Sequence, residues 1–224
     1  MSTTTTASER LTTEQLAARV ARDIPAGSYV NLGIGQPTRV ADFLPDDLGV
    51  VLHTENGMLG MGPAATGDRV DPDLTNAGKV PVTELPGASY FHHADSFAMM
   101  RGGHLDVCVL GAFQVAANGD LANWHTGAPD AIPAVGGAMD LAIGAKRVFV
   151  MMSLFAKDGS PKLVPACTYP LTGVGCVDKV FTDHAVLAIT DEGLVVEETF
   201  GISYDDLAAR LDVPLVDGTG QRSA

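Results

Sequence analysis

The sequence contains little cysteine and no long uninterrupted apolar run. Its three cysteines, Cys108, Cys167 and Cys176, form no Cys-x-x-Cys pair and leave an odd number. This count argues against a disulfide framework and suits a reducing compartment. Glycine, proline or charge interrupts every apolar run well short of the roughly 20 residues that a transmembrane helix needs. We therefore expect a cytoplasmic protein with no membrane span.

Positive charge is also scarce. Fourteen Lys and Arg residues stand against 27 Asp and Glu residues, which gives a net charge of −13. This balance disfavours a broad electrostatic interaction with nucleic acid. An anionic substrate would need local donors inside a pocket, because the overall field of the protein does not attract it. We expect neither a nucleic-acid partner nor a membrane partner.

The first ten residues are small and polar and lack the apolar stretch of a secretion signal, so residues 1–10 are predicted to form a disordered tail. The next segment, residues 11–24, has the pattern of an amphipathic helix. Thr12 and Gln15 have the spacing of a capping box, and Leu16, Val20 and Ile24 share one face. A strand over 27–35, a helix over 37–44 and a strand over 49–54 are predicted to follow.

The alternation of strand and helix returns later in the chain. The predicted elements are a strand over 104–115, a helix over 136–145, a strand over 146–154, short strands within 176–183, 185–190 and 193–200, and a helix over 203–211. This order predicts an α/β fold, a single domain with a mostly parallel or mixed sheet flanked by helices. The domain is expected to cover residues 11–216, with a flexible tail over 217–224.

Glycines gather where the predicted strands end, which is where open α/β sheets bind their ligands. Gly33 and Gly35 begin a dinucleotide-type fingerprint, but Thr38 stands in place of its third glycine. Their N–H groups could face a ligand oxygen, or the two residues could form only a tight turn. Gly136 and Gly137 precede a predicted helix, where N–H donors could bind an oxyanion or phosphate or merely permit close packing.

The segment LHTENGMLGMGP places one glutamate, Glu55, between a strand and a predicted loop with three glycines. The turn Asn56-Gly57 would hold the carboxylate outward in left-handed backbone conformations. A carboxylate in that place is a competent covalent nucleophile. A turn glutamate is more often simply solvated, so the residues alone leave both alternatives open.

The histidines do not predict a metal site. His92 and His93 would point to opposite faces of a strand, and no further histidine or cysteine has the spacing of a convergent ligand set. We therefore expect no metal. Either of these histidines, or His125 beside the single tryptophan Trp124, could recognise a substrate or serve only as a hydrogen-bonded structural residue.

Several ordered segments resemble the B (β) subunit of family I coenzyme A transferases of the 3-oxoacid type. They include NLGIGQPT, LHTENGMLGMGP, LPGASYFHHADSFAMMRGGHLD and KDGSPKLVPACTYPLTGVGCVD, and the likeness extends from about Leu11 to Leu215. In that family, the glutamate of a Ser-Glu-Asn-Gly motif is the nucleophile, and it corresponds here to Glu55. Thr54 stands where the family usually has serine, and it keeps the hydroxyl.

The resemblance implies ping-pong transfer of coenzyme A through a glutamyl thioester on Glu55, with no tightly bound cofactor. It implies that oxyanion and coenzyme A contacts come from Gly33, Gly35, Asn56, Gly136 and Gly137, and that acceptor contacts come from His92, His93 and His125. The finer likeness favours succinyl-CoA and 3-oxoadipate, as in aromatic degradation. Acetoacetate or another short-chain acid is the alternative, and a catalytically silent metabolite-binding protein is the non-enzyme alternative. The implied partner is the separate A subunit of a CoA-transferase, in a heterodimer or heterotetramer.

Overall fold

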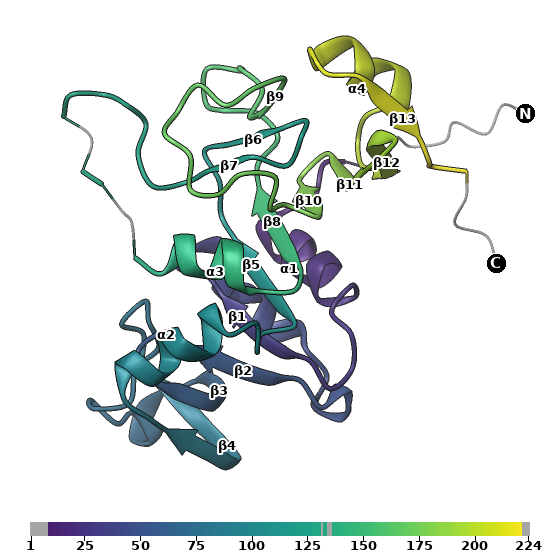
Figure 1. The fold of residues 1–224 in the computed structure, drawn as a ribbon. Helices are drawn as coiled ribbons and strands as arrows, with labels where there is room; N and C mark the ends of the chain where they lie inside the picture. Colours follow the sequence, from purple (N-terminus) through teal and green to yellow (C-terminus); the bar gives the residue numbers. More distant parts are fainter. Residues whose placement is uncertain (1–8, 131, 134–135, 221–224) are drawn as a thin grey trace, which may run out of the picture.

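A ten-stranded mixed sheet forms the centre of the molecule, in the order β13-β12-β11-β10-β8-β5-β1-β2-β3-β4, and helices flank it (Figure 1). A second sheet of three strands has the order β7-β6-β9. The computed structural model describes residues 9–130, 132–133 and 136–220, so most of the predicted N-terminal tail and residues 221–224 lie outside the described residues. The arrangement confirms the predicted α/β class.

The helical elements are α1 (Thr13–Ala21), α2 (His93–Arg101), α3 (Ala138–Gly144), α4 (Tyr204–Arg210) and the 3-10 helices η1 (Gln36–Phe43), η2 (Asp46–Leu48) and η3 (Gly67–Arg69). The strands of the large sheet are β1 (Tyr29–Leu32), β2 (Val51–Thr54), β3 (Met58–Ala64), β4 (Val82–Tyr90), β5 (Val107–Leu110), β8 (Val148–Met152), β10 (Lys179–Thr182), β11 (Ala185–Thr190), β12 (Gly193–Thr199) and β13 (Leu215–Asp217). The small sheet contains β6 (Gln114–Ala116), β7 (Leu121–Ala122) and β9 (Leu163–Val164).

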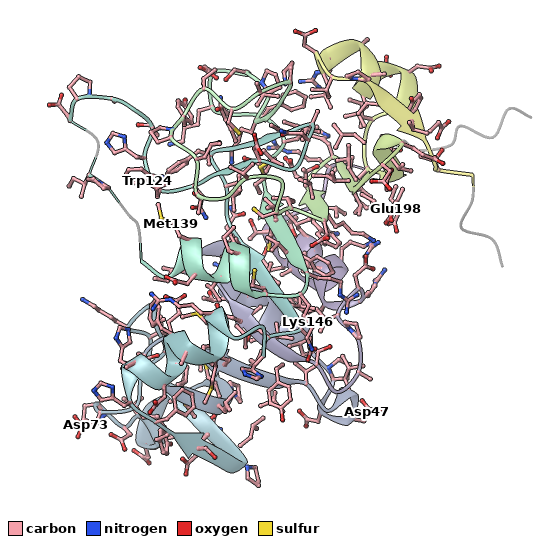
Figure 2. The ribbon with its side chains drawn as sticks, viewed as in Figure 1. Asp47, Asp73, Trp124, Met139, Lys146 and Glu198 are labelled. Atoms are coloured by element: carbon pink, nitrogen blue, oxygen red, sulfur yellow. The ribbon has the colours of Figure 1, made fainter. Side chains whose placement is uncertain are left out.

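The middle of the large sheet is parallel. β2 pairs with β1, β1 with β5, β5 with β8 and β8 with β10, all in the same direction. Because parallel strands end at the same edge, the segments after β1, β2, β5 and β8 meet there. Lys146 and Asp106 form an ion pair of 2.8 Å just before β8 and β5, at the opposite edge (Figure 2).

Both faces of these strands are buried, and alternate residues enter two separate cores. In β5, Val107 and Val109 pack into the core that contains α1, whereas Cys108 and Leu110 pack into the core on the other face. β8 follows the same period of two, which explains why its sequence is continuously apolar. The predicted apolar face of α1 is confirmed, since Leu16 and Val20 are buried, and Ile24, which lies three residues beyond the end of the helix, is buried as well.

The helix ends agree with several sequence signals. Thr12 and Gln15 form the predicted capping box, with the Gln15 N–H donating to Thr12 Oγ1 at 3.2 Å. Ser203 caps α4 by accepting from the Asp206 N–H. The helix predicted over 37–44 is present as the 3-10 helix η1, which begins one residue earlier. β13 extends to Asp217, one residue into the predicted C-terminal tail.

Two predictions about strands are wrong. The predicted glycine-rich loop after Glu55 is the strand β3, in which Gly60 and Gly62 permit close approach of β4. A Cβ on Gly62 would lie 2.6 Å from Thr83 Oγ1, so a side chain there would force β4 or the Thr83 side chain to shift. The single strand predicted over 104–115 is two strands, because the chain leaves the large sheet after Leu110 and β6 pairs with β7 and β9 instead.

Candidate active site

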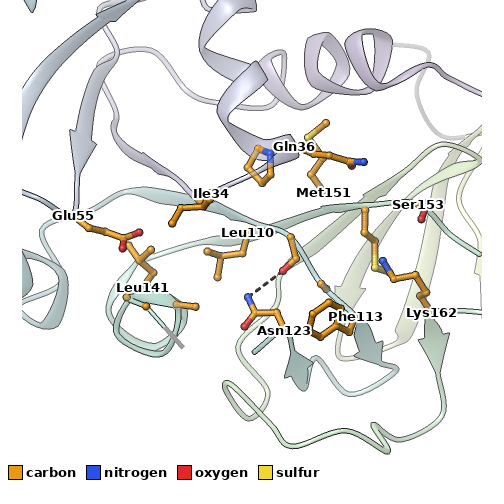
Figure 3. A pocket seen from close by; sticks show the side chains of 18 residues that line it. Ile34, Gln36, Glu55, Leu110, Phe113, Asn123, Leu141, Met151, Ser153 and Lys162 are labelled. Carbon is orange, nitrogen blue, oxygen red and sulfur yellow. Dashed lines mark hydrogen bonds between the residues drawn. The ribbon is translucent and has the colours of Figure 1, made fainter. Parts of the chain in front are cut away.

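A cavity of about 400 Å³ lies at the carboxyl ends of the parallel strands, where ligands bind in open α/β sheets (Figure 3). Its wall combines the turn after β1, the chain after β5, the end of β8 and the beginning of α3. The described residues that line it are Gly33, Ile34, Gln36, Pro37, Glu55, Leu110, Gly111, Ala112, Phe113, Asn123, Gly136, Gly137, Ala138, Leu141, Met151, Met152, Ser153 and Lys162.

Glu55 enters this cavity directly from the end of β2. The turn that follows is closed by the Gly57 N–H, which donates to Thr54 O at 3.1 Å. Gly57 has φ of 117°, and a side chain there would collide with the backbone carbonyl of Phe91. This confirms the left-handed glycine predicted for the turn. The carboxylate is not held outward, however, but is half-buried and points into the cavity (Figure 3).

Gly137 is in direct contact with the Glu55 carboxylate. Its backbone N–H hydrogen bonds to that carboxylate, and a Cβ at this position would lie 2.8 Å from Glu55 Oε2 and 3.0 Å from Glu55 Cδ. Any side chain would therefore displace the carboxylate. Two reasons were proposed for a glycine before α3, close packing and an N–H donor. Both apply to Gly137, which permits close approach of Glu55 and donates its N–H to the carboxylate.

The environment of Glu55 opposes its ionisation. Burial raises the pKa of this carboxyl above its ordinary value, and the charge of Asp140 acts in the same direction. The Gly137 hydrogen bond and the charge of His93 partly oppose that rise in pKa. A poorly solvated carboxylate that keeps one fixed N–H donor is suited to attack an electrophile, because little hydration has to be removed.

A buried hydrogen-bond network supports the strand end behind Glu55. His53 is 2% exposed, and its Nδ1 lies 3.1 Å from Asn31 Nδ2 while its Nε2 lies 3.0 Å from Ser96 Oγ. The Asn31 amide also donates to His53 O at 3.3 Å, which fixes the orientation of the amide group. Nδ1 therefore accepts, and the ring proton resides on Nε2.

The network ends on the peptide that links Thr54 to Glu55. With Nε2–H donating to Ser96 Oγ, the Ser96 hydroxyl donates to Thr54 O at 3.2 Å. Hydrogen bonds thus run from Asn31 through His53 and Ser96 to the carbonyl just before Glu55. Burial lowers the pKa of His53 to about 4, so the ring is neutral at pH 7 and this order of donors persists.

The other predicted glycine and asparagine contacts are less well placed. The Gly33 N–H donates to Val109 O at 2.8 Å within the sheet, so this N–H is not free for a ligand oxygen, although Gly33 lines the cavity. Gly35 is exposed and is not among the residues that line the cavity, whereas Gly136 lines it. The Asn56 side chain donates to Thr75 O at 2.8 Å and thereby holds a neighbouring loop.

The histidine pair does not lie on a strand, contrary to prediction. His92 caps α2, with its Nδ1 accepting from the Ala94 N–H at 3.1 Å, and His93 is the first residue of that helix. The chain turns here because the His92 side chain supplies the acceptor that a helix start requires. His93 packs edge-on against Phe97 at 4.7 Å between ring centroids, close enough to Glu55 for its charge to lower the pKa of Glu55.

His125 does not line the cavity that Glu55 enters. Its Nδ1 accepts from the Gly127 N–H at 2.9 Å, and its ring lies beside Trp124. None of the three predicted substrate histidines is among the described residues that line the cavity.

Within the described ranges, no group of three or more His, Cys, Asp or Glu residues is arranged to hold a metal ion. No helix in the part of the chain that the structure describes has the length and apolarity to cross a bilayer.

Sequence reasoning missed His53, Ser96 and Lys162. The first two are single polar residues in otherwise apolar or mixed segments, and only the register that pairs Asn31 with His53 brings the network together. Ser96 lies on α2, a helix that was not predicted. Lys162 follows a turn between β8 and β9 and enters the cavity from the small sheet, far from Glu55 in sequence.

Comparison with known proteins identifies the family of this chain. The family model described as coenzyme A transferase matches residues 13–205. A protein of Acinetobacter baylyi, named as the B subunit of 3-oxoadipate CoA-transferase, is 59% identical over 94% of this chain and 97% of that protein. A Helicobacter pylori protein, named as the B subunit of succinyl-CoA:3-ketoacid coenzyme A transferase, is 44% identical over 89% of this chain and 96% of that protein.

A solved structure shares the fold at low identity. The acyl-CoA transferase of Escherichia coli O157:H7 superposes with a TM-score of 0.70 at 21% identity, over 95% of this chain. The present chain spans only 43% of the length of that protein. With a family model over most of its length and relatives well above 30% identity, the chain belongs to the coenzyme A transferase family.

Proposed function

We propose that this chain is the B subunit of a 3-oxoadipate CoA-transferase that moves coenzyme A from succinyl-CoA to 3-oxoadipate through Glu55. The observation that carries the proposal is the position of the Glu55 carboxylate. It leaves the end of β2, enters the cavity and meets the Gly137 N–H, which is the arrangement that a fixed carboxylate nucleophile requires.

The first half-reaction consists of two acyl substitutions. A Glu55 oxygen attacks the thioester carbonyl of succinyl-CoA, the C–S bond breaks, and a mixed anhydride and the coenzyme A thiolate result. The thiolate then attacks the glutamyl carbonyl, and succinate leaves with the electron pair of the broken C–O bond. The product is a glutamyl thioester, and the acceptor acid reverses both steps.

Gly137 has a defined part in the second substitution. When the thiolate adds to the glutamyl carbonyl, negative charge develops on a Glu55 oxygen. The Gly137 N–H already hydrogen bonds to that carboxylate, so it is placed to stabilise this oxyanion with little rearrangement. Apolar walls, including Leu110 and Leu141, would limit water and thus hydrolysis of the thioester.

The choice of 3-oxoadipate rests on the relatives. Identity to the A. baylyi 3-oxoadipate enzyme exceeds identity to the H. pylori 3-ketoacid enzyme by 15 percentage points (59 minus 44) over similar shares of the chain.

Both relatives are named as B subunits, which supports a separate A subunit as the partner of this chain, in a heterodimer or heterotetramer. All three cysteines are free thiols, which supports a location in the reducing cytoplasm.

The test is a steady-state assay of this chain assembled with its A subunit. Initial rates at several succinyl-CoA and acceptor concentrations should give the parallel double-reciprocal lines of a ping-pong reaction, with kcat/KM for 3-oxoadipate well above that for acetoacetate. A marked preference for acetoacetate would contradict the assigned acceptor. Intersecting lines would contradict the covalent mechanism. The Glu55→Gln variant serves as the inactive control.

A further inference from the structure

Lys162 occupies a rigid position at the cavity wall. Its backbone N–H donates to Leu154 O at 2.9 Å, and its carbonyl accepts from the Val115 N–H at 2.9 Å. The residue is thereby fixed between the chain that follows β8 and the strand β6. Its side chain lines the cavity, and Figure 3 shows it at the opposite end from Glu55.

The charge of Lys162 lacks a close partner. Among the described residues that line the cavity, Glu55 and Lys162 are the only acid and the only base. No hydrogen bond or ion pair joins the Lys162 ammonium to any residue in the described parts of the chain. Asp183 acts on it only through its field, and the Asp183 carboxylate itself accepts from the Leu154 N–H at 2.8 Å and lies 3.7 Å from Arg10 Nη1.

A half-buried ammonium group without an acceptor is unfavourable in the empty protein. Burial lowers the pKa of Lys162, and the field of Asp183 only partly opposes this. A bound anion would remove the penalty by supplying a charge-assisted hydrogen bond. The net charge of the protein is −13, so its overall field does not attract an anionic substrate. A cation inside the cavity supplies that attraction locally.

The wall between the two charged groups is largely apolar. The side chains there include Leu110, Phe113, Leu141 and Met151, and Met152 also lines the cavity. Such a wall packs against methylene groups and adapts to them, because methionine is flexible and polarisable. The cavity therefore matches a chain-like ligand that has a reacting carbonyl at one end and an anionic group further along.

We propose that Lys162 binds an anionic group of the substrate, remote from the carbonyl that reacts with Glu55. This inference rests on the proposed function and adds a residue that determines substrate affinity. Two substrate groups have the required chemistry: the far carboxylate of a dicarboxylic acyl group and a phosphate of coenzyme A. Both are oxygen anions to which the ammonium of a lysine can donate one or more N–H groups.

The experiment compares Lys162→Met and Lys162→Arg with wild type, each assembled with the A subunit. Lys157→Met is the matched control, because Lys157 lies in the turn before Lys162 but is exposed and outside the cavity. Three donors are used: succinyl-CoA, butyryl-CoA and succinyl-pantetheine. Loss of one charge-assisted hydrogen bond should raise KM about 10- to 100-fold for a donor that carries the relevant anion, with a smaller change in kcat.

The donors distinguish the two anions. If Lys162 binds the carboxylate, Lys162→Met weakens both succinyl donors and leaves butyryl-CoA unchanged. If it binds a phosphate, the variant weakens both coenzyme A thioesters and leaves succinyl-pantetheine unchanged. Lys162→Arg should restore part of the affinity in either case. Equal loss for all three donors, or no loss for any of them in a folded complex, would overturn the proposal.

Direct binding keeps this inference separate from the proposed function. Calorimetric titration of coenzyme A and of succinate into the assembled proteins should show weaker binding of one ligand to Lys162→Met and normal binding to Lys157→Met. A wild-type complex that binds these ligands but transfers no coenzyme A would contradict the proposed function alone. Identical affinities for wild type and Lys162→Met would overturn the role of Lys162 whether or not transfer occurs.

Discussion

The two ends of the cavity each hold one charged group, and they are constructed in opposite ways. At one end, Glu55 receives the Gly137 N–H, and its strand is supported by the hydrogen bonds from Asn31 through His53 and Ser96. At the other end, Lys162 has a fixed backbone, but its ammonium meets no acceptor among the described residues. The chain itself thus orients the carboxylate, whereas the cation is left for a ligand.

Removing the charge of Glu55 should have the largest effect on this contrast. Glu55→Gln keeps an acceptor for the Gly137 N–H but is not a nucleophile, so transfer should fall at least about 1,000-fold.

The Glu55→Gln variant should also be more stable than wild type at neutral pH. Burial raises the folded-state pKa of Glu55, so the free energy of unfolding falls as the pH rises through that pKa. Melting temperatures at pH 7 and at pH 4 should show this gain at pH 7 and its disappearance at pH 4.

The raised pKa also predicts a pH dependence of the reaction. Only the carboxylate form of Glu55 attacks, so the rate of adduct formation should increase with pH through a midpoint above the ordinary glutamate value. Rapid-quench measurement of adduct formation at a series of pH values would give this midpoint. A midpoint at or below the ordinary value would show that the carboxylate is well solvated and would contradict the buried environment.

A methyl group on Gly137 should disturb the Glu55 end without altering any charge. In Gly137→Ala, the new Cβ would lie 2.8 Å from Glu55 Oε2, so the carboxylate must move. A displacement of about 1 Å from the reactive position is expected to slow adduct formation about 100-fold. Single-turnover rates would measure this effect. Gly220→Ala, whose added methyl meets nothing within 4 Å, is the control and should leave the rate unchanged.

Replacing His53 should change the response of stability to acid. Burial lowers its pKa to about 4, below the value of about 6.5 in the unfolded chain, so the unfolded state binds the proton more readily. Stability that is present at pH 7 is therefore lost as the pH falls. Between pH 7 and pH 5 the loss should be about 2 kcal/mol, and it should be absent in His53→Gln. Urea unfolding at both pH values would measure the difference, and equal losses in the two proteins would contradict the network.

The smallest effects are expected at Thr54, which stands where the family usually has serine. Thr54 is 4% exposed, and its hydroxyl has no hydrogen-bond partner among the described residues. Thr54→Ser should cost about 1 kcal/mol of stability for the lost methyl group and should leave the transfer rate within about twofold. Thr54→Val should be neutral or stabilising, since it removes an unpaired hydroxyl. A strongly destabilised Thr54→Val would mean that the hydroxyl has a partner.

The sequence was sufficient to predict the features that depend on local patterns. The cap at Thr12, the apolar face of α1 and the left-handed glycine after Glu55 follow from neighbouring residues, and the structure confirms all three. The strand β3 was missed because glycines usually mark loops, and here they permit close strand pairing. α2 was missed because His92 acts as an uncommon helix cap.

The site was harder to predict because it depends on contacts between distant segments. The residues alone left Glu55 undecided between a nucleophile and a solvated turn, and only the resemblance to a family favoured the nucleophile. The contact with Gly137 joins residues 82 positions apart (137 minus 55), and Lys162 approaches from the small sheet. Periodicity and spacing contain no information on such contacts, which arise from the order of strands in the sheet.

The most direct test is the mass of this chain after incubation with succinyl-CoA, in the complex with its A subunit. We predict an increase equal to covalent coenzyme A, located by peptide mapping on Glu55, absent from Glu55→Gln and removed by addition of 3-oxoadipate. If only a different acid removes the adduct, the assignment of Glu55 as the nucleophile stands and the assignment of 3-oxoadipate as the acceptor is wrong. An unmodified chain in a folded complex, or an adduct on another residue, would contradict the assignment of Glu55 as the nucleophile.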